Sequence, residues 1–108
     1  MSRRSTTPEL TVIAWRDIPA QVVARAGRNV VKRELPIRFQ AAIDRAAMRA
    51  GLDDTDGYLA EWRRTSRPCD DDLERAVAEE IERLESTYTA DLLKSTAENG
   101  GMIDDPQR

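Results

Sequence analysis

Two short runs of β-branched and aromatic residues near the start of the chain place the strongest constraint on its fold. The runs are residues 10–15 (LTVIAW) and 20–25 (AQVVAR), and Gly27 follows the second run. Such runs are typical of β-strands. Pro19 lies between them and fits a turn better than a strand ladder, because proline cannot donate a backbone hydrogen bond. The sequence therefore predicts a β-hairpin.

A hairpin needs other elements to cover it, since an isolated two-stranded sheet is marginally stable in water. The chain has 108 residues, which suits one domain. Residues 29–35 fit either an extended connector or a short third strand through Val30 and Val31.

Residues 36–50 carry the clearest helix signal. Pro36 stands at the expected first position, and Gly51 follows the end. At helical spacing the apolar side chains fall on one narrow stripe, which we expect to face the core. The stripe consists of Phe39, Ile43, Ala46, Ala47 and Ala50.

Residues 58–64 can be interpreted in two ways. As a helix capped by Thr55, they bring Tyr58, Leu59 and Trp62 together. As a strand, they alternate Tyr58 and Trp62 against Leu59. We favour the strand, because a third strand helps to stabilise the hairpin.

An acidic amphipathic segment occupies residues 70–99. Its apolar stripe is Leu73, Val77, Ile81, Leu84, Tyr88 and Leu92. One continuous helix over this segment would be longer than a compact domain is wide. We expect a break at residues 86–89, where Thr89 can cap a second helix. Without the break, the overhanging stripe would need a partner, such as a second copy of the chain.

These elements predict an α+β domain with a small antiparallel sheet packed by helices. The domain covers residues 9–99, with an α+β core at 9–66 and the acidic helices at 70–99. Residues 1–8 and 100–108 are rich in small and polar residues, and we expect them to be disordered ends.

The composition excludes several kinds of site. The chain has no histidine and one cysteine, Cys69. It therefore cannot form a Ser-His-Asp triad, an internal disulfide or a self-contained zinc site. The aspartates at 53–56 and 70–72 suit turns and helix caps better than metal ligands. We predict no cofactor, no metal site and no catalytic residue of the chain's own.

Charge is distributed unevenly along the chain. Residues 1–50 carry ten Lys and Arg against four Asp and Glu, whereas residues 51–108 carry seven against sixteen. The two halves could attract each other when folded, or the basic half could bind an anionic partner. The basic candidates are Arg28, Arg33, Arg38, Arg45 and Arg49. The net charge of −3 argues against an unaided nucleic-acid binder.

A second group of candidates surrounds the predicted hairpin turn: Trp15, Arg16, Asp17 and Gln21. Two interpretations carry equal weight. In one, Asp17 accepts turn amides and Trp15 packs over the helix. In the other, the corner is exposed for recognition, and Arg16→Ala or Arg28→Ala weakens a complex with little change in melting temperature.

The chain resembles a bacterial small-domain family known as "virulence factor". The similar segments are residues 15–22 (WRDIPAQV), 27–28, 32–36, 38–39 and 42–48, together with Tyr58, Leu59 and Trp62. The resemblance covers residues 9–64 well. It implies an interaction module, because the family also occurs at the end of larger virulence proteins. Stand-alone members accompany genes of folate- and corrinoid-linked methyl transfer, which implies a role in one-carbon metabolism.

The leading hypothesis is a cytoplasmic accessory protein that docks a larger protein. The alternatives are a small anion- or nucleotide-binding subunit that completes another enzyme's active site and, more weakly, an RNA-binding module. No run of apolar residues is long enough to span a membrane, so we expect no membrane association.

Overall fold

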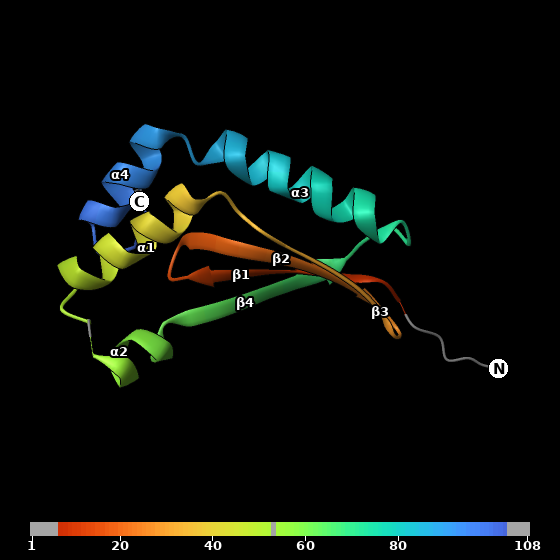
Figure 1. Cartoon of the computed structure of the whole chain (residues 1–108), viewed down its shortest axis with the longest axis horizontal. Helices are drawn as coiled ribbons and strands as arrows, with labels where there is room; N and C mark the ends of the chain where they lie inside the picture. The colour runs from red at the N-terminus through yellow and green to blue at the C-terminus, as the bar shows by residue number, and fades with distance from the viewer. Residues whose placement is uncertain (1–6, 53, 104–108) are drawn as a thin grey trace.

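A four-stranded antiparallel sheet forms the centre of the molecule (Figure 1). The computed structural model describes residues 7–52 and 54–103. The strands are β1 (Glu9–Trp15), β2 (Ile18–Ala26), β3 (Asn29–Glu34) and β4 (Trp62–Pro68), and their order across the sheet is β3-β2-β1-β4. The predicted hairpin is confirmed, and residues 29–34 form a third strand rather than a connector.

Helices accompany this sheet, and most of them lie on one of its sides. They are α1 (Ile37–Arg49), α2 (Thr55–Ala60), α3 (Leu73–Thr87) and α4 (Ala90–Glu98). Helices α1 and α3 pack on β2, and α4 packs on α1. Figure 1 shows α1, α3 and α4 on the same side, with α2 near one end of β4. The architecture is the predicted α+β class. Within the described ranges, no helix is long and apolar enough to cross a membrane.

The core lies between the sheet and the helices. Trp15 and Ile18 from the hairpin, Phe39 and Ile43 from α1, and Val77 from α3 are all fully buried. The predicted stripe on α1 is largely confirmed, although Ala42 is buried in it and Ala50 is half-buried. Small side chains on this stripe let α1 approach its neighbours closely, so the short chain still builds one continuous core.

The hairpin turn is tighter than predicted, and the assignment of Pro19 to the turn was wrong. Only Arg16 and Asp17 connect the strands, and Pro19 is buried in β2 opposite Ala14. The register shifts between Ile13 and Ala14, which marks a β-bulge. A bulge is one of the few places in a strand that accept proline, because the ladder is locally interrupted.

Residues 58–64 contain both structures that the sequence left open. Helix α2 covers Tyr58 to Ala60, so the favoured strand interpretation was wrong for these residues. Asp54 caps the helix by accepting from the Gly57 amide, in place of the expected Thr55. Strand β4 begins only at Trp62 and continues to Pro68, two residues past the predicted core boundary.

The acidic segment breaks where expected. Helix α3 ends at Thr87, and the Thr89 hydroxyl accepts the Leu92 amide to begin α4. The break means that the segment forms no single long helix with an overhanging apolar stripe. It also turns α4 onto α1, where Leu93 and Ala97 are buried.

Residues 100–103 are tied to the hairpin turn, although the sequence placed them in a disordered end. The Asp17 amide donates to the Gly101 carbonyl at 2.8 Å, and the Ile103 amide donates to the Asp17 carboxylate at 2.8 Å. Gly100 and Gly101 are buried. The predicted disorder at residues 1–6 and 104–108 lies outside the described residues.

A buried carboxylate joins β4 to α3. Glu80 is 3% exposed and bonds Arg67 of β4 at 2.7 Å and Arg83 of its own helix. Burial raises the pKa of the Glu80 carboxyl, but the hydrogen bonds and charges of Arg83 and Arg67 outweigh it. The pKa therefore lies below the ordinary value of 4.5.

Glu80→Gln is expected to lower the free energy of unfolding by about 1–3 kcal/mol at neutral pH, because both arginines lose their charged partner. The depressed pKa of Glu80 contributes stability above about pH 4.5, and this contribution disappears as the pH falls through the folded-state value. The difference between the native protein and the variant should therefore shrink in acid. Urea denaturation at several pH values measures it. A difference that grows on acidification would contradict this assignment.

Candidate functional site

Trp15, the first residue of the predicted recognition corner, is buried in the core. Its indole N–H donates to the Tyr58 carbonyl at 2.8 Å, and its ring stacks on Tyr58 with centroids 5.7 Å apart. Gly101 approaches the ring so closely that a Cβ there would lie 2.9 Å from it. Trp15 therefore fixes the packing of α2 and the C-terminal segment, and it has no surface to present to a partner.

Arg16 is also occupied within the chain. It adopts a left-handed backbone conformation with φ 52°, which is unusual for a residue with a side chain. Its guanidinium bonds Glu61 at 2.9 Å and the Gly100 carbonyl at 3.0 Å, and lies over the Trp15 ring. These contacts hold the turn in its strained conformation.

Asp17 completes the corner with both its backbone and its side chain. Its carbonyl accepts the Tyr88 hydroxyl at 2.7 Å, and its carboxylate lies 3.4 Å from the Arg63 guanidinium. Burial raises the pKa of Tyr88, so its hydroxyl stays protonated and donates at neutral pH. Of the two interpretations left open, the geometry favours the structural corner.

The basic residues of the first half find partners in the second half. Arg33 pairs with Glu74 at 3.6 Å, and Arg38 pairs with Glu85 at 3.5 Å. Arg49 reaches the Glu98 carbonyl at 3.5 Å. Among the described residues, Arg28 and Arg45 form no ion pair. The charge asymmetry of the chain therefore partly serves folding, and the predicted site residues do not come together at one place.

Gln21 is the predicted site residue that lies on a different surface, which we call the open face. The open face is the side of the sheet opposite α1 and α3. It consists of Glu9, Thr11 and Ile13 of β1, Gln21, Val23 and Arg25 of β2, Val30, Lys32 and Glu34 of β3, and Trp62, Arg64 and Ser66 of β4. The hydroxyls of Thr11 and Ser66 bond each other at 2.7 Å across this face. Helices contact this face at one end, where Tyr58 of α2 packs edge-to-face on Trp62 and where Ile37 and Gln40 of α1 line a hollow.

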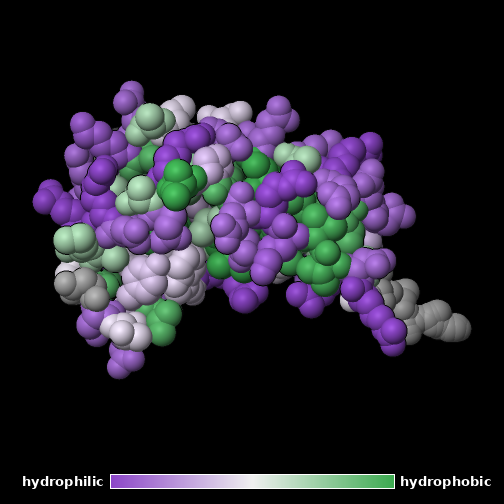
Figure 2. Space-filling view, viewed as in Figure 1, coloured by the Kyte–Doolittle hydropathy of each residue, from purple (hydrophilic) through white to green (hydrophobic). Residues whose placement is uncertain are grey.

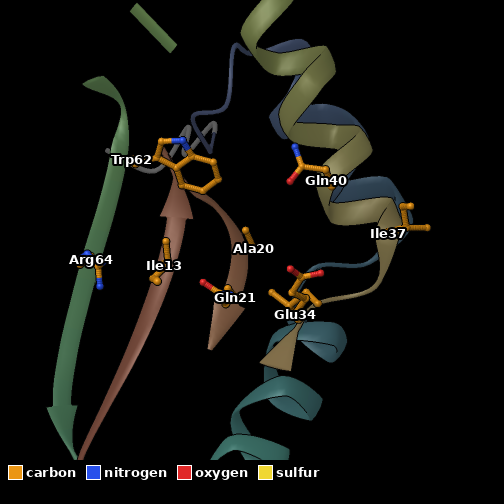
Figure 3. Close-up of a pocket in the computed structure, with 9 residues that line it drawn as sticks. Ile13, Ala20, Gln21, Glu34, Ile37, Gln40, Trp62 and Arg64 are labelled. Carbon is orange, nitrogen blue, oxygen red and sulfur yellow. The ribbon is translucent and has the colours of Figure 1, made fainter. Parts of the chain in front are cut away.

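The open face is hollowed at the end near α1. A pocket of about 730 Å³ lies there between β4, β1, β2 and the start of α1. Its apolar wall comes from Ile13, Ala20, Leu35, Ile37 and Trp62, and its polar groups come from Gln21, Glu34, Gln40 and Arg64. Figure 3 shows Trp62 and Gln40 facing each other across the hollow, with Ile37 projecting outward at the rim. The pocket continues into a smaller hollow of about 480 Å³ along the sheet.

The open face carries more basic than acidic side chains. The basic side chains are Arg25, Lys32 and Arg64, and the acidic ones are Glu9 and Glu34. Within the part of the chain that the structure describes, none of these five groups forms an ion pair. They remain available to charged groups of another molecule.

Other chemistry at the surface is sparse. Burial raises the pKa of the Cys69 thiol, and the neighbouring Asp70 and Glu9 raise it further against the opposing effect of Arg67. The thiol is therefore a poor nucleophile at neutral pH. No group of three potential metal ligands occurs among residues 7–52 and 54–103. Figure 2 shows a mainly hydrophilic surface in this view, with hydrophobic residues exposed in separate patches.

Comparison with known sequences places the chain in a family. Residues 13–96 match the sequence model of a family described as "Virulence factor". The chain belongs to the virulence factor family. The match begins in β1 and ends in α4, so it includes the corner, the pocket and the buried Glu80. Neither the curated proteins nor the solved structures contain a significant match to this virulence factor family member.

Sequence reasoning missed the open face because it followed arginines rather than the alternation of strands. Trp62 and Arg64 belong to β4, whose start could not be located from the sequence because residues 58–64 fitted either a helix or a strand. Once β4 starts at Trp62, the period of two places Trp62 and Arg64 on the side of Ile13 and Gln21. A correct strand boundary was the signal that could have found the pocket.

Arg16→Ala and Arg28→Ala test whether the corner at Arg16 is structural, because Arg28 lies in the exposed turn between β2 and β3. Arg16→Ala should lower the free energy of unfolding by about 1–3 kcal/mol, because Glu61 and the Gly100 carbonyl lose a charged donor. The melting temperature should then fall by roughly 5 °C or more. Arg28→Ala should leave it nearly unchanged, since Arg28 is exposed. Equal melting temperatures for the two variants, measured by circular dichroism, would show that the corner is not structural.

Proposed function

We propose that this virulence factor family member is a non-catalytic accessory protein that docks a larger protein through the open face. The observation that supports the proposal is the asymmetry of the sheet. Helices bury one side, and the other side carries apolar residues, unpaired charges and a pocket among the described residues. The lack of histidine and the raised pKa of Cys69 support a role in binding rather than in catalysis.

The pocket supplies the apolar centre that a protein interface needs. Ile37 is 86% exposed, although it is a large aliphatic residue at the rim of the pocket that the half-buried Trp62 also lines. Interfaces concentrate their binding energy in a few aromatic and aliphatic anchors that fill pockets. We propose that an apolar side chain of the partner enters the pocket between Trp62 and Ile37.

The charges around the pocket determine which charged groups the partner should carry around its apolar anchor. Arg25, Lys32 and Arg64 outnumber Glu9 and Glu34, so a partner with acidic groups around its apolar anchor is complementary. The sequence resemblance adds a proposal about its identity. We propose that the partner is an enzyme of folate- or corrinoid-linked one-carbon metabolism.

Ile37→Gln tests the docking proposal, with Met48→Gln as its matched control. Both residues are exposed aliphatic side chains of α1, at 86% and 72%, but only Ile37 lines the pocket. Tagged protein purified from its own host should recover at least roughly tenfold less partner with Ile37→Gln, because the interface loses an anchor. Met48→Gln should recover a normal amount.

The melting temperatures of both variants should stay close to that of the native protein, since neither side chain is buried. Equal recovery of partner by Ile37→Gln and the native protein would contradict the proposal.

The size of the pocket also favours a second candidate function. A volume of about 730 Å³ lies within the range of small-molecule sites, and Trp62 with Arg64 suits a flat anionic ligand. A thermal-shift screen with nucleotides, folates and inorganic phosphate distinguishes the two functions. A shift by one compound that disappears in Arg64→Gln supports the ligand-binding subunit, and no shift by any compound supports protein docking.

A further inference from the structure

Strand β4 forms one edge of the sheet, and no described strand pairs with its outer side. The direction of its backbone groups follows from the bonds at its two ends. The Arg16 amide donates to the Glu61 carbonyl, and the Cys69 amide donates to the Pro8 carbonyl. Because hydrogen-bonded pairs alternate along an antiparallel ladder, residues 63, 65 and 67 bond β1.

The remaining backbone groups of β4 point away from the sheet. They are the N–H and C=O groups of Arg64 and Ser66 in the middle of the strand, with those of Trp62 at its start. Pro68 occupies the next outward position, where its missing N–H costs no bond to β1. From Arg63 to Pro68 every residue is exposed. An unpaired edge of this kind is a template for another extended chain.

The side chains of β4 determine which chain can pair with it. Arg63 and Arg67 project on the helix side, where they pair with Asp17 and Glu80. Arg64 projects on the open face and forms no ion pair among the described residues, and the strand contains no acidic residue. The other edge strand, β3, carries both signs in Lys32, Arg33 and Glu34. Opposite charges across a strand pair are stabilising and like charges are destabilising. The β4 edge therefore favours acidic chains and opposes pairing with a second copy of itself.

We propose that the outer edge of β4 binds an extended acidic segment of the partner protein by strand addition. This inference rests on the proposed docking function and names the part of the partner that is recognised. The segment's backbone pairs with Arg64 and Ser66, and its carboxylates lie on the open-face side, next to Arg64, which is unpaired among the described residues. Since Arg64 also lines the pocket, a segment on this edge lies next to the pocket.

A synthetic heptapeptide of alternating glutamate and valine, with blocked ends, tests the proposal on the full chain. Nitrogen–proton NMR spectra should show shifts and slower hydrogen exchange at the Arg64 and Ser66 amides. The same peptide with lysine in place of glutamate should bind at least roughly tenfold more weakly. Added salt should weaken the binding of the glutamate peptide. Equal binding of both peptides, or no binding of either, would overturn the proposal.

Ser66→Pro and Ser66→Ala form a matched pair that isolates the backbone donor. Both variants lose the hydroxyl bond to Thr11, but only proline also loses the outward N–H. Ser66→Ala should bind the glutamate peptide as the native protein does, whereas Ser66→Pro should bind it at least roughly tenfold more weakly. Equal binding by folded Ser66→Pro would overturn strand addition. Should Ser66→Pro fail to fold, a backbone N-methylated glutamate peptide makes the same test on the native protein.

Failure of this inference is distinguishable from failure of the docking function. Ile37→Gln lies in the pocket and should lose the natural partner while it still binds the peptide. If Ile37→Gln loses the partner but the peptide does not bind β4, docking stands and strand addition is wrong. If the peptide binds β4 but Ser66→Pro recovers the partner normally, the edge is not part of the natural interface and the proposal is overturned.

Discussion

The two-residue turn at Arg16 and Asp17 holds separate parts of the chain together. Arg16 bonds Glu61 and the Gly100 carbonyl, while Asp17 bonds Tyr88, Arg63 and Ile103. The turn therefore connects the hairpin to the segment after α2, to the end of α3 and to the C-terminal segment. These contacts offset the backbone strain of Arg16 at φ 52°. Because they join the turn to Tyr88 and to the segment after α4, the position of both C-terminal helices depends on the hairpin.

This arrangement decides which surface is left for recognition. The corner uses its arginine, its aspartate and its tryptophan internally, and Arg33 and Arg38 bond carboxylates of α3. The helices thereby cover one side of the sheet, and the described residues of the opposite side keep their charges unpaired. An antiparallel sheet tolerates one solvated face, but a solvated face does not require the pocket beside Trp62 or the exposed Ile37.

The sequence predicted the α+β class, the hairpin, the main helix and the break at Thr89, because these features depend on local patterns of apolar residues and caps. It misplaced Pro19, since a bulge depends on pairing with a distant strand. It also misjudged Tyr58, because a short helix and a strand share the same few apolar residues. The corner could not be resolved, since the bond from Arg16 to Gly100 spans 84 residues. Arginine-rich stretches indicated charge but not whether that charge was already paired.

Amide hydrogen exchange in the complex isolated from the native host tests the central claim most directly. The claim is that the partner covers the open face and the outer edge of β4. Exchange in the complex should slow at Arg64 and Ser66 and along the start of α1, relative to the free protein, while the exposed side of α3 remains unchanged. Protection confined to α3 and α4, with β4 exchanging as in the free protein, would contradict the account.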